Sequence, residues 1–171
     1  MAASKYEKYV VRKAGVVVRV GNDYHDEIPE SDVFPPVSAT DTGPRVIFSN
    51  DLIPNATTKI EYGYALGDQI VGGGADLVQV HKHNYEEIFL FLGTDPQDTA
   101  KLGAEVEFWL GEGDDRDKVV LTTSSAVYIP PNVAHFPQIW RNVTRPVLIM
   151  VIMPTVGERD LELVPNNGHT K

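Results

Sequence analysis

The sequence contains no cysteine, so a whole group of sites and stabilising bonds is absent. Disulfides, zinc–thiolate sites, iron–sulfur clusters and thiol nucleophiles all require cysteine, and they are excluded together. Any metal ion that this protein binds must therefore be held by nitrogen and oxygen ligands.

Basic residues are scarce as well. In 171 residues, 15 Lys and Arg stand against 24 Asp and Glu, which gives a formal charge of −9, and the basic residues form no cluster. Nucleic acids and anionic membranes are bound largely by cations that neutralise phosphates, so we expect neither as a partner. Small molecules are the partners that this composition favours.

Long apolar segments are the third absence. The longest apolar run, Val147–Met153, is far too short to cross a bilayer, and the N-terminus lacks the apolar core of a secretory signal. We therefore expect a cytoplasmic protein. The same run is apolar on both faces of a strand, which requires cover on both sides and favours a homodimer over burial within one chain.

The remaining sequence reads as short strands separated by turn-forming residues. Because no long helical segment separates them, we expect an all-β sandwich or barrel. The ten expected strands are Val16–Val20, Arg45–Ser49, Lys59–Leu66, Asp76–His83, Glu86–Leu92, Ala104–Leu110, Lys118–Thr122, Ala126–Ile129, His135–Trp140 and Val147–Met153.

We expect three regions along the chain. Residues 1–44 form an N-terminal arm with a weak helical signal, one strand and an irregular proline-rich loop over 23–44 that contains His25. Residues 45–156 form the barrel. Residues 157–171 form a polar tail, with a short edge strand around Leu161.

Two histidines lie two residues apart in the segment QVHKHNYEEIF. In a strand, residues separated by an even number share a face, so His81, His83 and Glu87 are expected on one side. Apolar neighbours on that side mark it as the interior. Two imidazoles and a carboxylate buried there would each lose several kcal/mol of solvation unless they shared a partner, and a divalent cation satisfies all three.

A third histidine, His135, follows a prolyl turn at Pro130–Asn132. Together with His81, His83 and Glu87, this arrangement over residues 74–139 resembles the two motifs of the cupin superfamily. Departures are present: Gly74 and Gly93 are each displaced by one residue from the usual spacing, and Ser124, Asn132 and Ile139 replace the family's usual glycine, glycine and asparagine. Asn132 is the mildest change, because asparagine tolerates the left-handed conformation.

The resemblance implies a cupin-type double-stranded β-helix, a jelly-roll barrel, here with an N-terminal extension. It also implies that His81, His83, Glu87 and His135 bind one divalent metal ion. Three imidazoles and one carboxylate suit Fe(II), Mn, Ni, Co or Zn, and the sequence does not select among these metals. We expect His25 and His169 to lie in solvent and to have no role at the site.

The resemblance favours a metal-dependent enzyme that acts on a small oxygenated organic molecule, and among the possible reactions we favour dioxygenation. Isomerisation, decarboxylation and lyase chemistry are alternatives, as is a non-catalytic barrel that binds a small ligand. Tyr62, Tyr64 and Gln79 are the candidate catalytic residues, because hydroxyl and amide groups can hold a substrate oxygen or pass a proton. Ordinary packing remains an alternative for both tyrosines.

Overall fold

The computed structural model describes residues 4–20, 23–28, 44–73, 79–155 and 161–164. Apart from two short 3-10 helices, η1 (Glu7–Tyr9) and η2 (Gly113–Asp115), the regular structure in these ranges is strand. The strands are β1 (Gly15–Val20), β2 (Asp23–Glu27), β3 (Arg45–Phe48), β4 (Lys59–Ala65), β5 (Gln69–Val71), β6 (His81–His83), β7 (Glu87–Gly93), β8 (Lys101–Leu110), β9 (Asp117–Thr123), β10 (Ser125–Ile129), β11 (His135–Arg141), β12 (Val147–Met153) and β13 (Leu161–Leu163).

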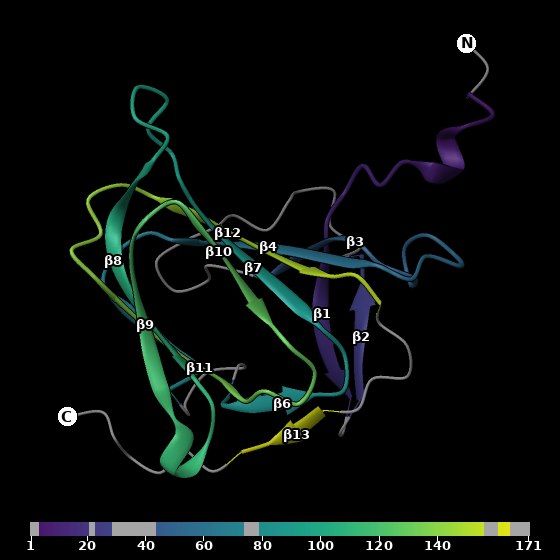
Figure 1. The fold of residues 1–171 in the computed structure, drawn as a ribbon. Helices are drawn as coiled ribbons and strands as arrows, with labels where there is room; N and C mark the ends of the chain where they lie inside the picture. The colour runs from purple at the N-terminus through teal and green to yellow at the C-terminus, as the bar shows by residue number, and fades with distance from the viewer. Residues whose placement is uncertain (1–3, 21–22, 29–43, 74–78, 156–160, 165–171) are drawn as a thin grey trace.

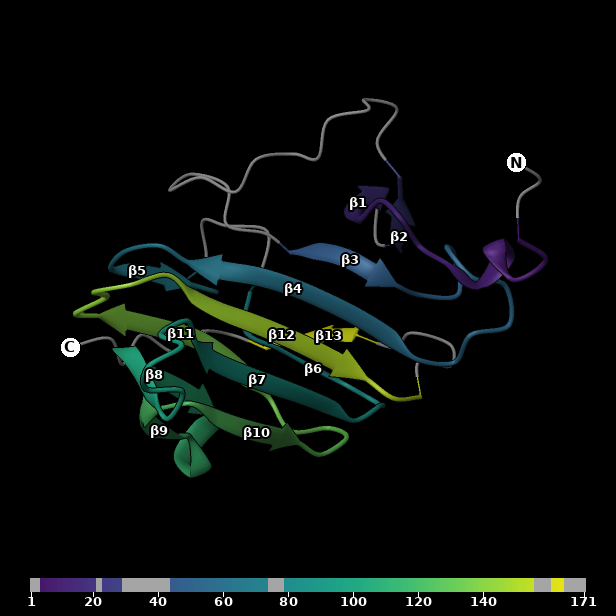
Figure 2. The ribbon, with the colours of Figure 1, turned by 90° about the horizontal axis from the view of Figure 1, so that it is seen from above.

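The strands form two sheets that face each other. The first has seven strands in the order β10-β7-β12-β4-β3-β1-β2, and the second has the order β13-β6-β11-β8-β9, with β5 paired to β11. All pairings are antiparallel. Seen from above, β6, β11 and β13 lie behind the seven-stranded sheet (Figure 2), and the β1–β2 hairpin stands at one side of the barrel (Figure 1). The expectation of an all-β barrel is confirmed.

The core lies between the inner faces of the two sheets. Side chains that alternate along β7, β8 and β11 supply its large members, Phe89, Phe91, Phe108 and Trp140, each at most 2% exposed. Their rings contact one another edge to face or at a tilt, with centroids 5.0 to 5.8 Å apart for Phe89–Phe108, Phe91–Phe108 and Phe91–Trp140. Such packing accounts for the strong inside–outside alternation that the sequence displays.

Strand β12 is central in its sheet, between β7 and β4. Val147, Ile149 and Val151 face the core, whereas the intervening side chains of Leu148, Met150 and Ile152 stay half-buried on the outer face. The strand is therefore apolar on both faces, as expected. The homodimer that we predicted from this run stays a prediction.

Several elements differ from the expectations. The expected proline-rich loop begins with a strand, β2, so His25 lies in a hairpin that pairs with β1 rather than in a loop. The rest of that loop, 29–43, falls outside the described residues, as do Gly74 and His169. Strand β5 was also missed. The expected edge strand near Leu161 is present as β13.

No helix among the described residues is long and apolar enough to span a membrane.

Candidate metal centre

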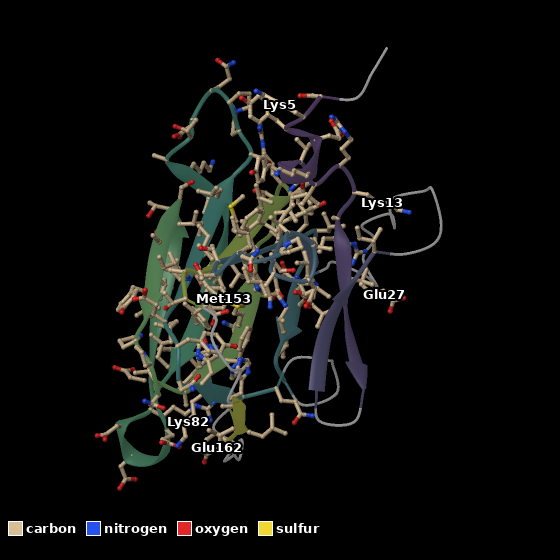
Figure 3. All side chains as sticks on the ribbon, turned by 90° about the vertical axis from the view of Figure 1, so that its right-hand side faces the viewer. Lys5, Lys13, Glu27, Lys82, Met153 and Glu162 are labelled. Atoms are coloured by element: carbon tan, nitrogen blue, oxygen red, sulfur yellow. The ribbon has the colours of Figure 1, made fainter. Side chains whose placement is uncertain are left out.

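The first two histidines of the site lie on β6, a strand of three residues. Strand β13 pairs with β6 along its whole length, and β11 pairs with it through His135 and His81. Between the histidines, Lys82 projects outward, where its Nζ lies 3.0 Å from a carboxylate oxygen of Glu112 and 3.6 Å from one of Glu162. Figure 3 shows Lys82 and Glu162 together at the lower edge of the molecule. The expected alternation along this strand is confirmed.

The turn before β11 places His135. Asn132 has φ of 65°, the left-handed conformation that asparagine was expected to tolerate there. Its backbone N–H donates to the carbonyl of His83 over 2.7 Å, which ties the turn to the strand that carries the first two histidines. His135 then begins β11 fully buried, directly opposite His81.

Glu87 begins β7 and is 4% exposed. Its Oε2 lies 3.2 Å from Nε2 of His83 and 3.0 Å from Nε2 of His135. The nearest ligand-type atoms of the three histidines all lie within 4.8 Å of one another. The three histidines therefore lie close together inside the barrel, and Glu87 contacts two of them, His83 and His135.

Backbone carbonyls fix the tautomer of all three imidazoles. Nδ1 of His81 lies 2.7 Å from the carbonyl of Gln79, and Nδ1 of His83 lies 2.7 Å from that of Tyr85. Nδ1 of His135 lies 3.1 Å from the carbonyl of Val133. A carbonyl only accepts, so each Nδ1 must donate, and each neutral ring then presents a lone pair at Nε2. Histidines that bind metals through Nε2 typically make this second contact.

One buried nitrogen of the histidine cluster, Nε2 of His135, is left without a hydrogen bond. Nε2 of His135 lies 3.0 Å from Glu87 Oε2, and this buried atom has no hydrogen-bonding partner among the described residues. A buried polar atom without a partner carries a desolvation penalty of about 1–3 kcal/mol. A cation between Glu87 and the three imidazoles removes this penalty, so the donor set fits a divalent metal ion.

The charge states of the site favour metal binding. Burial, with a smaller contribution from His135, lowers the pKa of His81 to about 4, so its imidazole is neutral and its Nε2 can bind a metal at neutral pH. Burial acts to raise the pKa of Glu87, but its close contacts with the rings of His135 and His83, at 3.0 and 3.2 Å, outweigh burial and lower that pKa to about 2. Glu87 is therefore an anion at neutral pH.

Aromatic rings hold two of the imidazoles in place. The ring of Tyr85 stacks on His83 with centroids 3.9 Å apart and planes at 3°. Phe136 stacks on His81, with ring centroids 5.6 Å apart and planes at 26°.

Phe136 has φ of 80° at an irregularity in β11, so it faces inward directly after His135 instead of alternating outward. A Cβ at Gly72 would lie 2.7 Å from Cβ of Phe136, so glycine is needed there. The sequence pattern does not predict this irregularity in β11.

Of the three candidate catalytic residues, only Gln79 lies next to the histidines. Tyr62 and Tyr64 pair with Met150 and Leu148, on the outer face of the seven-stranded sheet, where their rings contact each other at 6.2 Å. Gln79 lies next to the site, and its backbone carbonyl orients His81. The structure therefore gives Gln79 a positioning contact and places both tyrosines away from the interior.

Lys59 and Glu61, on the same strand as the tyrosines, lie on its inner face and were not singled out from the sequence. Strand parity separates the two pairs, but parity alone does not tell which pair faces inward. The pairing of β4 with β12 supplies that information, because Val151, opposite Glu61, packs against the core.

No protein-family model matches the sequence, and no curated protein matches it. Among solved structures, the chain resembles an uncharacterised protein with a double-stranded β-helix domain from Klebsiella pneumoniae, with 13% identity over 79% of this chain and 93% of that one and a TM-score of 0.51. This likeness establishes the fold.

Weaker likenesses extend to two further structures. A cupin-2 domain protein from Rhodospirillum rubrum has 11% identity and a TM-score of 0.45 over 71% of this chain and 64% of that one. The DMSP lyase DddQ from Ruegeria pomeroyi has 18% identity and a TM-score of 0.42 over 67% of this chain. The chain spans 46% of the length of that lyase.

Proposed function

The chain has the double-stranded β-helix fold of the cupin superfamily, and from this premise we propose that it is a metal-dependent enzyme acting on a small oxygenated organic molecule. His81, His83, Glu87 and His135 would hold one divalent ion, Fe(II), Mn, Ni, Co or Zn. The observation that supports this proposal most directly is the cluster of three imidazoles, each with its Nδ1 hydrogen-bonded to a carbonyl, beside the buried carboxylate of Glu87.

When bound, the ion supplies Lewis acidity and, if it is redox-active, the ability to react with O₂. The side chains and backbone around the ion would set its charge balance, hold its ligands in place and exclude water. Glu87 offsets one of the two positive charges, and the three carbonyls prevent the imidazoles from rotating. The rings of Phe89, Phe108 and Phe136 exclude water from the inner side of the site.

Among the possible reactions we propose dioxygenation, with isomerisation, decarboxylation or lyase chemistry as the alternative. The shell of three histidines and one glutamate serves both, so the fold does not decide between them. Turnover that continues at full rate under strict anaerobiosis, in protein loaded with zinc or manganese, would exclude oxygenation. A barrel that binds metal and small ligands but turns none of them over would instead be the non-catalytic binding protein.

Elemental analysis of the protein as purified, without added metal, tests the proposal most directly. We expect close to one equivalent of a divalent transition metal per chain and a melting temperature that falls on chelation. A metal that binds only the folded chain adds about 2.7 kcal/mol when its free concentration is a hundredfold above Kd. Purified protein that contains no metal, takes none up and melts at the same temperature with chelator would contradict the proposal.

We also propose a homodimer that buries the outer face of β4, β12 and β7. Three half-buried apolar side chains of β12, Leu148, Met150 and Ile152, lie on that face beside Tyr62 and Tyr64. Sedimentation of the wild type and of a Met150→Glu variant tests this, and a wild type that sediments as a monomer would overturn it.

A further inference from the structure

A second group of charged side chains lies on the inner wall of the barrel, outside the candidate metal centre. Lys59 and Glu61 of β4 pair with Met153 and Val151 of β12. Val151 in turn pairs with Phe89 of β7, two residues beyond Glu87. Residues that pair in an antiparallel sheet point to the same side, so these charged groups face the interior that holds Glu87. Two strand spacings, about 10 Å, separate β4 from β7.

These charges are buried and joined to a third. Lys59 Nζ lies 2.6 Å from Oδ1 of Asp26, which comes from the N-terminal hairpin, and 2.7 Å from Oε1 of Glu61. The side chains of Lys59 and Asp26 are 6% and 0% exposed. Burying ions costs several kcal/mol each even when they are paired, so a packed apolar wall would be at least as stable here. The cluster therefore points to a role beyond stability.

Glu61 differs from its two partners. Its side chain keeps 12% of its surface exposed. Burial raises the pKa of Glu61 and outweighs the attraction of Lys59, and the negative charges of Glu87 and Asp26 act in the same direction. Lys59 therefore compensates the buried Glu61 carboxylate only in part, and a hydrogen-bond donor placed against it would stabilise it.

The inner wall is less completely buried around Glu61 than around the phenylalanines. Glu61, its neighbour Val151 and His81 all face inward, yet none of them is fully buried. By contrast, the inward-facing Phe91 and Phe108 are completely buried. A small molecule bound at the histidines would extend through the partly exposed region, because the phenylalanines fill the rest.

We propose that Glu61 is a second recognition point of the site, which accepts a hydrogen bond from a hydroxyl or amine of a substrate held through an oxygen at the histidines. This inference rests on the proposed metal function. Lys59 and Asp26 are positioning residues, because they fix the Glu61 carboxylate and do not themselves contact the substrate. The substrate class is a small molecule with a metal-binding oxygen at one end and a hydrogen-bond donor further along its chain.

Matched probes test the inference without knowledge of the substrate. The protein is loaded with Co(II), and dissociation constants are measured from the visible spectrum for 3-hydroxypropanoate and 4-hydroxybutanoate, each against the unsubstituted acid of equal length. Hydrogen bonds to charged groups are worth 1.5–3 kcal/mol, so at least one hydroxy acid should bind about 10-fold to 100-fold more tightly than its partner. Succinate, which offers only acceptors, should bind more weakly than butanoate.

The Glu61→Gln variant should reduce this preference to about 3-fold or less while retaining cobalt. Glu112→Gln is the matched control, since it removes an exposed carboxylate on the outside of the barrel and should retain the full preference. Should Glu61→Gln fail to fold, Glu61→Asp replaces it, and the preference in the wild type alone still decides.

A wild type that binds both members of each pair equally would overturn this inference, and so would a Glu61→Gln variant that keeps the full preference. Both results would leave the proposed metal function intact. If cobalt fails to bind at the histidines, the proposed function is lost and this inference is lost with it.

Discussion

The two halves of the barrel interior are built on the same strands but contain opposite chemistry. Strand β7 begins with the carboxylate of Glu87 and continues, on the same face, with Phe89 and Phe91. The phenylalanine half is apolar and fully buried, whereas the histidine half carries three clustered imidazoles, the carboxylate of Glu87 beside two of them, and the partly exposed carboxylate of Glu61. One half therefore supplies apolar packing, and the other half holds the polar groups of the candidate site.

The loss of one imidazole should have the largest effect of the changes considered, a loss of metal binding. That effect should be confined to the histidine half. We expect His83→Ala to weaken metal binding by more than about 100-fold, because it removes one of the four proposed ligands, and even outer contacts of ligands are worth 10- to 100-fold. Metal content by elemental analysis and titration with Co(II) would measure this.

His25→Ala is the matched control, because it removes a histidine of the β2 hairpin that lies outside the cluster. This variant should retain the metal. Equal metal content in the two variants would refute the assignment of the site.

Truncation of a side chain in the phenylalanine half should lower stability and leave metal binding intact. Phe91 is fully buried against Phe108 and Trp140, so Phe91→Ala should lower the free energy of unfolding by about 3–5 kcal/mol. Urea unfolding of the metal-free protein would measure this loss. Below the unfolding transition, the folded variant should still bind one equivalent of metal. If Phe91→Ala abolished metal binding in the folded state, the two halves would not be separable.

The largest pKa shifts in the metal-free protein belong to His81 and Glu87, so the pH should act mainly through the histidine half. His81 has a folded pKa of about 4 against an ordinary 6.5, so between these values the unfolded chain binds a proton that the folded chain does not. Stability therefore falls as the pH falls from 6.5 to 4. Glu87, at about 2 against 4.5, stabilises above pH 4.5, and that contribution is lost as the pH falls towards 2.

Urea midpoints measured from pH 7 to pH 4 would check this dependence. His81→Gln should flatten the upper part of the curve, whereas Phe91→Leu should lower the whole curve and leave its slope unchanged. A slope that survives in His81→Gln would assign the pH dependence to other groups.

Much of the fold could be predicted because it depends on local periodicity. The alternation in β7 and β6 and the left-handed turn residue Asn132 follow directly from rules that act within a few residues. Strand β2 could not be found, because its sequence DYHDE is polar and becomes a strand only by pairing with β1. Tertiary pairing overrides propensity in such segments.

The candidate site was only partly predictable for a related reason. Parity placed His81, His83 and Glu87 together, but it could not orient β4, whose inward pair is Lys59 and Glu61 rather than the tyrosines. Nor could parity anticipate Phe136, which faces inward because β11 is irregular at that point. Which face of a strand is buried, and where the alternation breaks, depends on neighbours that are distant in sequence.

The smallest expected effect comes from Lys82, which lies between the two histidines of β6 yet belongs to neither half of the interior. Its ion-pair partners Glu112 and Glu162 are exposed to solvent, and Figure 3 shows Lys82 beside Glu162. Exposed pairs contribute little and are screened by salt. Lys82→Ala should therefore leave metal affinity unchanged and lower the melting temperature by at most about 2 °C, a difference that disappears in high salt. A large loss of metal affinity in Lys82→Ala would show that the outer face of β6 holds the histidines in place, and the separation of interior from surface would fail at this strand.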